Sequence, residues 1–207
     1  IECAQRIPIV RIGGNSQGVL DEVDVDFNKW SCAVVNHLIE YGHRRIAMIV
    51  DSIDYEDGEG HNTKLAGYRK SLSLHNIEYN PALVFSVHYL HQNIKHLMQQ
   101  IMSLKERPTA IFAYSDDLAG GLIKALTTAG YKVPEDVSVV GFNDDWFADR
   151  LAVSLTTCRL PANEIGRGAA ELLIRRRKNR TLPPVRRMYE CQVVIRDSTA
   201  RHSDTAG

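Results

Sequence analysis

The sequence predicts an α/β fold in which parallel sheets are flanked by helices. Short apolar segments rich in β-branched residues alternate along the chain with amphipathic segments of helical spacing. Several of the apolar segments lack a polar face, which is typical of strands buried between two layers of helices. At 207 residues the chain is long enough to bury a sizeable core, as one domain or as two small lobes.

The elements follow in a regular order. We expect strands at "IPIVRI" (7–12), "RRIAMIV" (44–50), "ALVFSV" (82–87), "TAIFAY" (109–114), "VSVVGF" (137–142) and "LTTCRL" (155–160). We expect helices at 28–41, 61–75, 91–104, 116–129 and 163–177. Gly42 and Gly130 follow the first and fourth helices, where glycine commonly ends a helix. Strand, helix and strand in succession predict parallel crossovers. The chain runs through the polar segment "NSQGVLDEVDVDFN" (15–28) to the first helix.

The composition limits the class of protein. The 25 basic and 25 acidic residues cancel, so no overall charge draws the chain to nucleic acid or to a membrane surface. The four cysteines lie far apart without a CxxC pair, which favours a reducing cytoplasm over a disulfide framework or a zinc site. No apolar run approaches the roughly 18 residues that span a bilayer, and the start of the chain does not have the pattern of a signal peptide. We therefore expect a cytoplasmic protein without a cofactor.

Two predicted strands end in acidic clusters, "AYSDD" (113–117) and "GFNDDW" (141–146). Because the carboxyl ends of parallel strands open onto one edge of a sheet, these clusters should lie close together. One interpretation is a site for a polyol, in which Asp, Asn and Ser bind hydroxyls and an aromatic side chain covers an apolar ring face. A second is a catalytic or metal-binding carboxylate cluster of Asp116, Asp144 and Asp145.

The third interpretation is helix capping, since Ser115 and Asp116 stand directly before the apolar pattern of a helix. Capping by one residue does not exclude binding by its neighbour. We expect Asp116 to cap and orient the helix, and Ser115 to face a ligand.

Three other polar features have simpler explanations. The acidic loop "DYEDGEGH" (54–61) does not have the spacing of a calcium loop and is expected to be solvated or to form the rim of a site. His88, His91 and His96 share no obvious face and are expected at the surface rather than on a metal. The run "RRRKNR" (175–180) suits the C-terminal end of a helix dipole better than a DNA contact, because no helix-turn-helix accompanies it.

Several segments together resemble one family, the effector-binding core of lactose and galactose repressor-type transcription regulators, which is built like periplasmic sugar-binding proteins. The segments occur in the family's order and run almost from end to end of the chain. They are "HLIEYGHRRIAMI" (37–49), "KLAGYRKSL" (64–72), "RPTAIFAYSDDLAGGLIKALTTAGYKVPEDVSVVGFNDD" (107–145), "LTTCRLPANEIGRGAAELL" (155–173) and "CQVVIRDST" (191–199).

The resemblance implies a two-lobed, periplasmic-binding-protein-like fold. Residues 1–25 and 160–188 would form a partial N-terminal lobe, residues 26–159 and 189–199 the C-terminal effector-binding lobe, and residues 200–207 a tail. It further implies a small effector between the lobes (a sugar, nucleoside or related metabolite), a homodimer, operator binding through an N-terminal head, and no enzymatic activity. Because neither that head nor the first strands and helices of the family precede Ile1, we expect the chain to be a fragment with an incomplete N-terminal lobe.

Site residues also follow from the resemblance. Effector contacts would fall on Asp26, Lys64, Ser115 and Asn143, while Phe27 and Trp146 add aromatic surface that would stack on a ring or pack between the lobes. The family usually has Arg at position 64, and Lys offers one mobile point charge in place of a bidentate fork. Because this departure removes the fork that would bind two hydroxyls, the resemblance predicts a monosaccharide less strongly. The alternative function is a sugar-binding receptor of a transport system.

Overall fold

The computed structural model describes residues 7–14, 16–52, 64–88 and 93–202. The chain divides into two compact units, the first made of residues 1–26 and 160–191 and the second of residues 27–159 and 192–207. Each unit contains residues from distant parts of the sequence, and the chain passes from one unit to the other at residues 26–27, 159–160 and 191–192.

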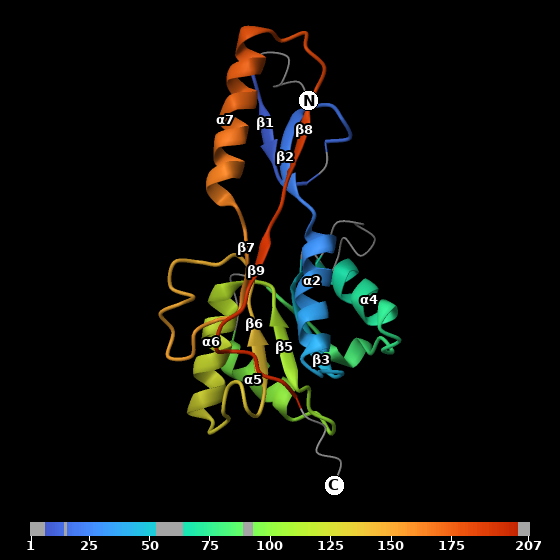
Figure 1. Ribbon diagram of the computed structural model, residues 1–207, viewed down its shortest axis with the longest axis vertical. Coiled ribbons are helices and arrows are strands. Elements are labelled where there is room, and N and C mark those ends of the chain that lie inside the picture. The colour runs from blue at the N-terminus through green and yellow to red at the C-terminus, as the bar shows by residue number, and fades with distance from the viewer. Residues whose placement is uncertain (1–6, 15, 53–63, 89–92, 203–207) are drawn as a thin grey trace. The chain divides into compact units, whose positions relative to one another are not determined.

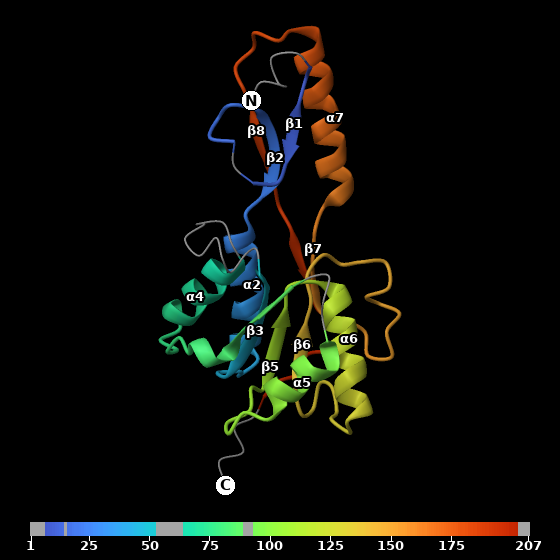
Figure 2. The same cartoon turned by 180° about the vertical axis from the view of Figure 1, so that it is seen from behind.

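The second unit is built on a four-stranded parallel sheet. Its strands are β3 (Ile46–Asp51), β4 (Val84–Val87), β5 (Ala110–Ala113) and β6 (Ser138–Val140), in the spatial order β4-β3-β5-β6. Helices α2 (Phe27–Glu40) and α4 (Lys64–Leu74) cover one face of this sheet, and α5 (Ile94–Met102) and α6 (Asp116–Thr128) cover the other, as Figures 1 and 2 show from opposite sides. The central strands β3 and β5 are almost entirely buried, which explains their unbroken apolar sequences.

The pairing of α2 with α4 depends on one glycine. A β-carbon at Gly67 would lie 2.2 Å from the carbonyl oxygen of Asn28 and 2.8 Å from the backbone nitrogen of Cys32. The two helix backbones therefore approach more closely than any larger residue permits. The hydroxyl of Ser31 donates a hydrogen bond to the Lys64 carbonyl (2.5 Å) and fixes the first turn of α4 against α2.

The first unit contains a three-stranded parallel sheet covered by one long helix. Strands β1 (Val10–Ile12), β2 (Asp21–Val25) and β8 (Arg186–Tyr189) lie in the order β1-β2-β8, and α7 (Ala162–Lys178) packs along them (Figure 1). Strand β2 lies in the polar segment 15–28, where the sequence predicted no strand. The acidic residues of β2 are buried, and arginines neutralise them.

The carboxylate of Asp21 illustrates this neutralisation. It accepts hydrogen bonds from Arg176 (2.7 Å) and Arg175 (3.3 Å) of α7 and from the backbone of Val185 (2.8 Å). Burial alone would raise the pKa of Asp21, but the bonds and charges of these arginines hold it below its usual value. The first two residues of the run "RRRKNR" therefore neutralise a buried carboxylate of this unit, a role that the sequence did not reveal.

The remaining strands form a small antiparallel pair in the second unit, β7 (Thr157–Arg159) with β9 (Gln192–Val194). Each lies beside a point where the chain passes to the first unit. After β9, residues 198–202 continue within the second unit. The backbone of Val139 donates to the Ser198 carbonyl (2.8 Å), and the backbone of His202 donates to the Tyr41 carbonyl (2.7 Å). The tail predicted from residue 200 therefore begins with hydrogen-bonded residues, and residues 203–207 lie outside the described part.

Most predicted elements are confirmed with shifted ends. Each predicted strand overlaps an observed one, although "IPIVRI" pairs only over 10–12 and "VSVVGF" only over 138–140, and α7 is longer than predicted. A short 3-10 helix, η1 (Pro81–Leu83), replaces the start of "ALVFSV". Gly42 and Gly130 adopt positive φ values of 93° and 89° after α2 and α6, as their position at helix ends requires. No helix in the described part of the chain combines the length and the apolar character that a membrane crossing needs.

Candidate functional site

The two acidic strand ends meet at one edge of the β4-β3-β5-β6 sheet, as predicted. The backbone of Asp116 donates a hydrogen bond to the Phe142 carbonyl (3.0 Å), and the backbone of Asp145 donates to the Asp116 carboxylate (2.7 Å). Thr157 of β7 donates its hydroxyl to the other oxygen of the same carboxylate (2.6 Å). The ends of β5 and β6 and the start of β7 therefore form one hydrogen-bonded structure.

Ser115, and not Asp116, caps α6, which corrects the prediction. The Ser115 hydroxyl accepts a hydrogen bond from the backbone of Leu118 (3.3 Å), as an N-cap residue does. Asp116 is fully buried and faces the 143–145 segment. Burial raises the pKa of Asp116 above its usual value, although the bonds from Thr157 and Asp145 act in the opposite direction. Asp116 therefore holds the strand ends together, and only 9% of Ser115 remains exposed beside it.

Asn143 and Asp144 adopt backbone conformations that are rare for residues other than glycine. Their φ angles are 128° and 61°. Hydrogen bonds from Asn143 to the Cys158 carbonyl (2.9 Å) and from the Asp144 backbone to the Thr157 hydroxyl (3.3 Å) impose this shape. Backbone strain of this kind persists only where surrounding contacts determine it, and it is concentrated at functional sites.

The side chain of Asp144 binds two arginines. Arg196 donates to one carboxylate oxygen and Arg159 to the other, both over 2.6 Å. Burial opposes the charged form, but these two bonds lower the pKa of Asp144 below its usual value. Arg159 is the last residue of β7, and Arg196 follows β9. Asp144 thus connects the strained turn to both strands of the antiparallel pair. This network was not predicted from the sequence, although the arginines of "LTTCRL" and "VVIRDST" belong to it.

Lys64 lies between two aromatic rings. Its ammonium nitrogen is 4.6 Å from the centre of the Phe142 ring and 5.2 Å from that of Phe27, and the two rings lie 6.0 Å apart. Each ring face attracts a cation. Three elements supply this cluster: Phe27 begins α2, Lys64 begins α4, and Phe142 follows β6. The structure therefore brings together Phe27 and Lys64, two of the predicted residues, around Phe142. Phe142 directly precedes Asn143 in the chain.

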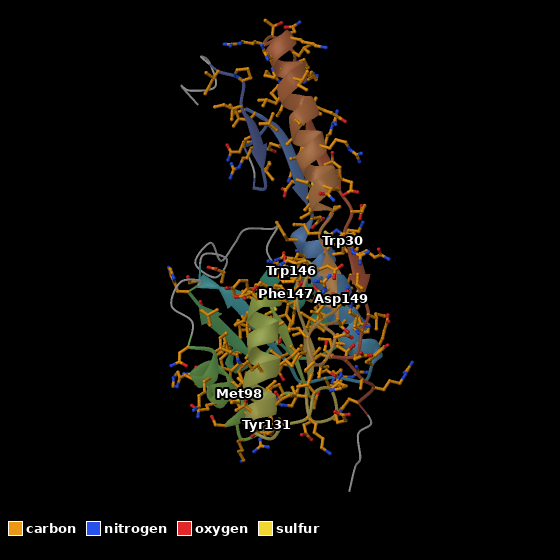
Figure 3. The ribbon with its side chains drawn as sticks, turned by 90° about the vertical axis from the view of Figure 1, so that its left-hand side faces the viewer. Trp30, Met98, Tyr131, Trp146, Phe147 and Asp149 are labelled. Carbon is orange, nitrogen blue, oxygen red and sulfur yellow. The ribbon has the colours of Figure 1, made fainter. Side chains whose placement is uncertain are left out.

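Asp26 and Trp146 are the other predicted residues. Asp26 directly precedes Phe27 in the chain, as the last residue of the first unit, and is partly buried. Trp146 is 75% exposed, and its ring packs against the ring of Phe147 (5.8 Å between centres) and under the guanidinium of Arg150 (5.5 Å). Figure 3 shows Trp146 and Phe147 beside each other near one end of α6.

The described residues do not assemble a metal site. Within residues 7–14, 16–52, 64–88 and 93–202, no group of three His, Cys, Asp or Glu side chains could hold an ion. His88 and His96 are exposed, as predicted for surface histidines, and they line a shallow hollow of about 430 Å³ beside β4. His91 and the acidic loop 54–61 lie outside the described residues.

The chain is similar to known transcription regulators along most of its length. It is 33% identical over 190 residues to the HTH-type transcriptional regulator CelR of Thermobifida fusca, which is 90% of this chain and 55% of that protein. It is 32% identical over 180 residues to the HTH-type transcriptional repressor CytR of Escherichia coli K12, covering 87% of this chain and 52% of the repressor. The chain thus spans about half the length of these curated relatives.

Structure and family comparisons agree. The fold superimposes on the complex of the transcriptional regulator CelR with cellobiose with a TM-score of 0.79 at 29% identity, over 91% of this chain and 58% of that one. The family described as periplasmic binding protein-like domain matches residues 35–199, most of the chain. The chain therefore belongs to the family of periplasmic binding protein-like domains, in the form found in LacI-type transcription regulators.

Proposed function

We propose that this chain is the effector-binding part of a cytoplasmic DNA-binding transcription regulator that senses a small metabolite, a sugar or a related polyol. The observation that carries the proposal is the arrangement at the strand ends, where the strained Asn143 turn lies next to the Lys64 cation and its two aromatic rings. The relative CelR, whose structure holds cellobiose, supports a sugar as the class of effector. We assign direct contacts to Lys64 and Asn143, with Asp26, Phe27 and Ser115 as further candidates.

The proposed mechanism is differential binding. An effector that binds one conformation of the protein more tightly than another shifts the population towards the tighter-binding conformation. The size of this shift is limited by the ratio of the two affinities. Asn143 is the residue through which the shift would begin, because its neighbour Asp144 is bonded to Arg159 and Arg196. Arg159 directly precedes one chain crossing, and Arg196 follows β9, which begins at another. A contact at Asn143 therefore acts on the segments that lead to the first unit.

Two other functions are less well supported. A receptor of a transport system would share the fold, but the relatives CelR and CytR are transcription regulators. An enzyme acting through carboxylates would need acids turned towards a substrate. Asp116 is instead buried under two hydrogen bonds, and both oxygens of Asp144 are bonded to arginines. We therefore propose no enzymatic activity.

We further propose that the regulator is a homodimer and that the surface around α5 and α6 contacts the second copy. Trp146 is 75% exposed, which is unusual for a tryptophan without a partner surface. A mainly apolar groove of about 900 Å³ lies between α5 and α6, with Ile94, Met98 and Tyr131 among its lining residues. Figure 3 shows Met98 and Tyr131 towards the other end of α6 from Trp146. We assign Trp146, near the opposite end of α6 from this groove, to the same surface because its large exposed area would be covered by a partner.

A thermal-shift screen of the full-length protein with sugars, nucleosides and small acids tests the effector proposal. A ligand that binds only the folded state raises the melting temperature, by an amount that grows with its concentration. We expect at least one member of the sugar and polyol group to do so. If no compound of the screen changed the melting temperature at millimolar concentration, the proposal would fail.

A further inference from the structure

The outer face of α6 carries two exposed residues of opposite charge. Asp117 lies in the first turn of the helix, Lys124 lies seven positions later, and both are exposed. The opposite face of α6 is buried in the core of the second unit through Leu118, Leu122 and Leu126. Because seven positions make about two helical turns, Asp117 and Lys124 share one face. The side that α6 turns away from its own core therefore has an acid near one end and a base near the other.

The two charges are too far apart to bind each other within the helix. A rise of about 1.5 Å per residue separates positions seven apart by roughly 10 Å, whereas an ion pair requires about 4 Å between the charged atoms. Between them lie Gly120 and Gly121, which are partly exposed and have no side chains. The middle of the face is therefore flat, and each end offers its charge to the outside.

The arrangement is symmetric about the glycine pair. Asp117 stands three positions before Gly120, and Lys124 stands three positions after Gly121. If a second α6 lay across the first in the opposite direction, with the glycine pairs facing each other, each acid would lie opposite a base. Because a twofold axis repeats every contact, this arrangement would form two ion pairs. A parallel arrangement would place like charges opposite each other, which is unfavourable. The face is therefore complementary to an antiparallel copy of itself.

Apolar surface flanks the charged face on both sides. Successive helical residues point about 100° apart, so Gly120 and Gly121 mark two different sides of α6. A β-carbon at Gly121 would meet Ile94 of α5, and the apolar groove of about 900 Å³ lies on this side. A β-carbon at Gly120 would approach the ring of Phe147 at 3.9 Å, and the exposed Trp146 packs against that ring. A partner that rests on this face would therefore gain apolar contacts from both sides.

Building on the proposed homodimer, we propose that α6 of the second copy crosses α6 antiparallel at Gly120 and Gly121, and that Asp117 of each copy binds Lys124 of the other. Exposed ion pairs are individually weak, so the apolar surface on either side supplies most of the affinity. The two ion pairs set the direction and the register of the contact, because the parallel direction opposes like charges.

Reversal of one charge at a time tests this register in the full-length protein. Asp117→Lys and Lys124→Glu each place two pairs of like charges across the proposed contact. We expect each variant alone to raise the dimer dissociation constant about tenfold or more, as measured by sedimentation velocity, and the effect to shrink as salt is added. Glu78→Lys and Lys70→Glu make the same changes of charge at exposed positions outside α6, and they should leave the dissociation constant unchanged.

A mixture of the two α6 variants provides a rescue that a folding defect cannot imitate. In a dimer of Asp117→Lys with Lys124→Glu, every charge of the contact faces a charge of the opposite sign. We expect the mixture to form mainly heterodimers, with an affinity close to that of the wild type. Native mass spectrometry with an affinity tag on one variant measures their fraction. The double variant restores both pairs within one chain, so its homodimer should also recover, which keeps the test open if one single variant fails to fold.

Two results would overturn the inference and leave the proposed homodimer standing. One is an unchanged dissociation constant in both folded single variants, and the other is a mixture without preference for the heterodimer. A full-length wild type that stayed monomeric at every concentration would overturn the proposed homodimer together with this inference, while the effector proposal would remain.

Discussion

His43 is the residue whose ionisation the structure constrains most clearly. It is 2% exposed, and its Nε2 atom donates to the Ala200 carbonyl (3.1 Å), because a carbonyl can only accept. Its Nδ1 atom therefore accepts from the Thr109 hydroxyl (2.9 Å). Burial lowers the pKa of His43 from 6.5 to about 4, the Ala200 bond acts in the opposite direction, and the nearby His202 and His37 add to the lowering. The neutral ring joins the start of β5 to residues 198–202.

This environment predicts a loss of stability in acid. Because the folded-state pKa of His43 lies below its unfolded value, its contribution is complete above pH 6.5 and is lost as the pH falls towards 4. His37, whose pKa burial also lowers while Glu40 opposes the shift, adds a contribution of the same sign. Between pH 7 and pH 4.5 we expect His43 alone to account for a decrease in unfolding free energy on the order of 2 kcal/mol.

Urea unfolding between pH 4.5 and pH 7 measures this dependence of the unfolding free energy on pH. The variant His43→Gln should show a weaker dependence on pH, while His75→Gln, at an exposed histidine of α4's C-terminal end, should follow the wild type. Equal pH dependence in the wild type and in His43→Gln would contradict the assignment.

At the scale of elements, the junction of α2 with α4 determines where Lys64 lies. Gly67→Ala would place a β-carbon 2.2 Å from the Asn28 carbonyl, and rigid backbone atoms cannot yield. We expect a loss of about 1–3 kcal/mol in unfolding free energy, typical of overpacking, and weaker effector binding as the helices separate.

Gly120→Ala in α6 provides the control. A β-carbon there would meet Leu151 at an ordinary 3.5 Å, so we expect no loss of stability, or a gain of about 0.5–1 kcal/mol from the higher helix propensity of alanine. Denaturant unfolding monitored by circular dichroism compares the two variants. If Gly67→Ala and Gly120→Ala had equal unfolding free energies, the contact between α2 and α4 would tolerate a residue larger than glycine.

Elements that form their hydrogen bonds locally and bury apolar faces were predictable from the sequence. Strand β5 and helix α6 follow directly from apolar spacing and from the polar residues between them. Strand β2 was not predictable, because its "DEVDV" reads as solvated until Arg175, Arg176 and Arg186 are placed opposite its acids. The meeting of the two strand ends was predictable from parallel order. The Asp144 network was not, because its arginines come from segments up to 52 residues away.

At the scale of the whole molecule, the proposed homodimer has a direct test. Trp146→Ala should raise the dimer dissociation constant about tenfold or more, because exposed tryptophans at an interface contribute much of its binding energy. Leu74→Ala, at a side chain that is 64% exposed at the end of α4, removes apolar surface elsewhere in the same unit and should leave the dimer intact. Sedimentation velocity over a concentration series measures both. An unchanged dissociation constant in Trp146→Ala would place the interface elsewhere.

The central claim is that an effector binds at the strained turn after β6, and Asn143→Gly tests it most directly. Glycine adopts a φ of 128° without strain, so the substitution removes the side chain while the turn keeps its shape. The measurement is the affinity of the full-length protein for the best compound of the thermal-shift screen, determined by calorimetry for the wild type and for this variant. We predict that Asn143→Gly retains or gains thermal stability and loses affinity about tenfold or more. Wild-type affinity in a stably folded Asn143→Gly variant would contradict the account.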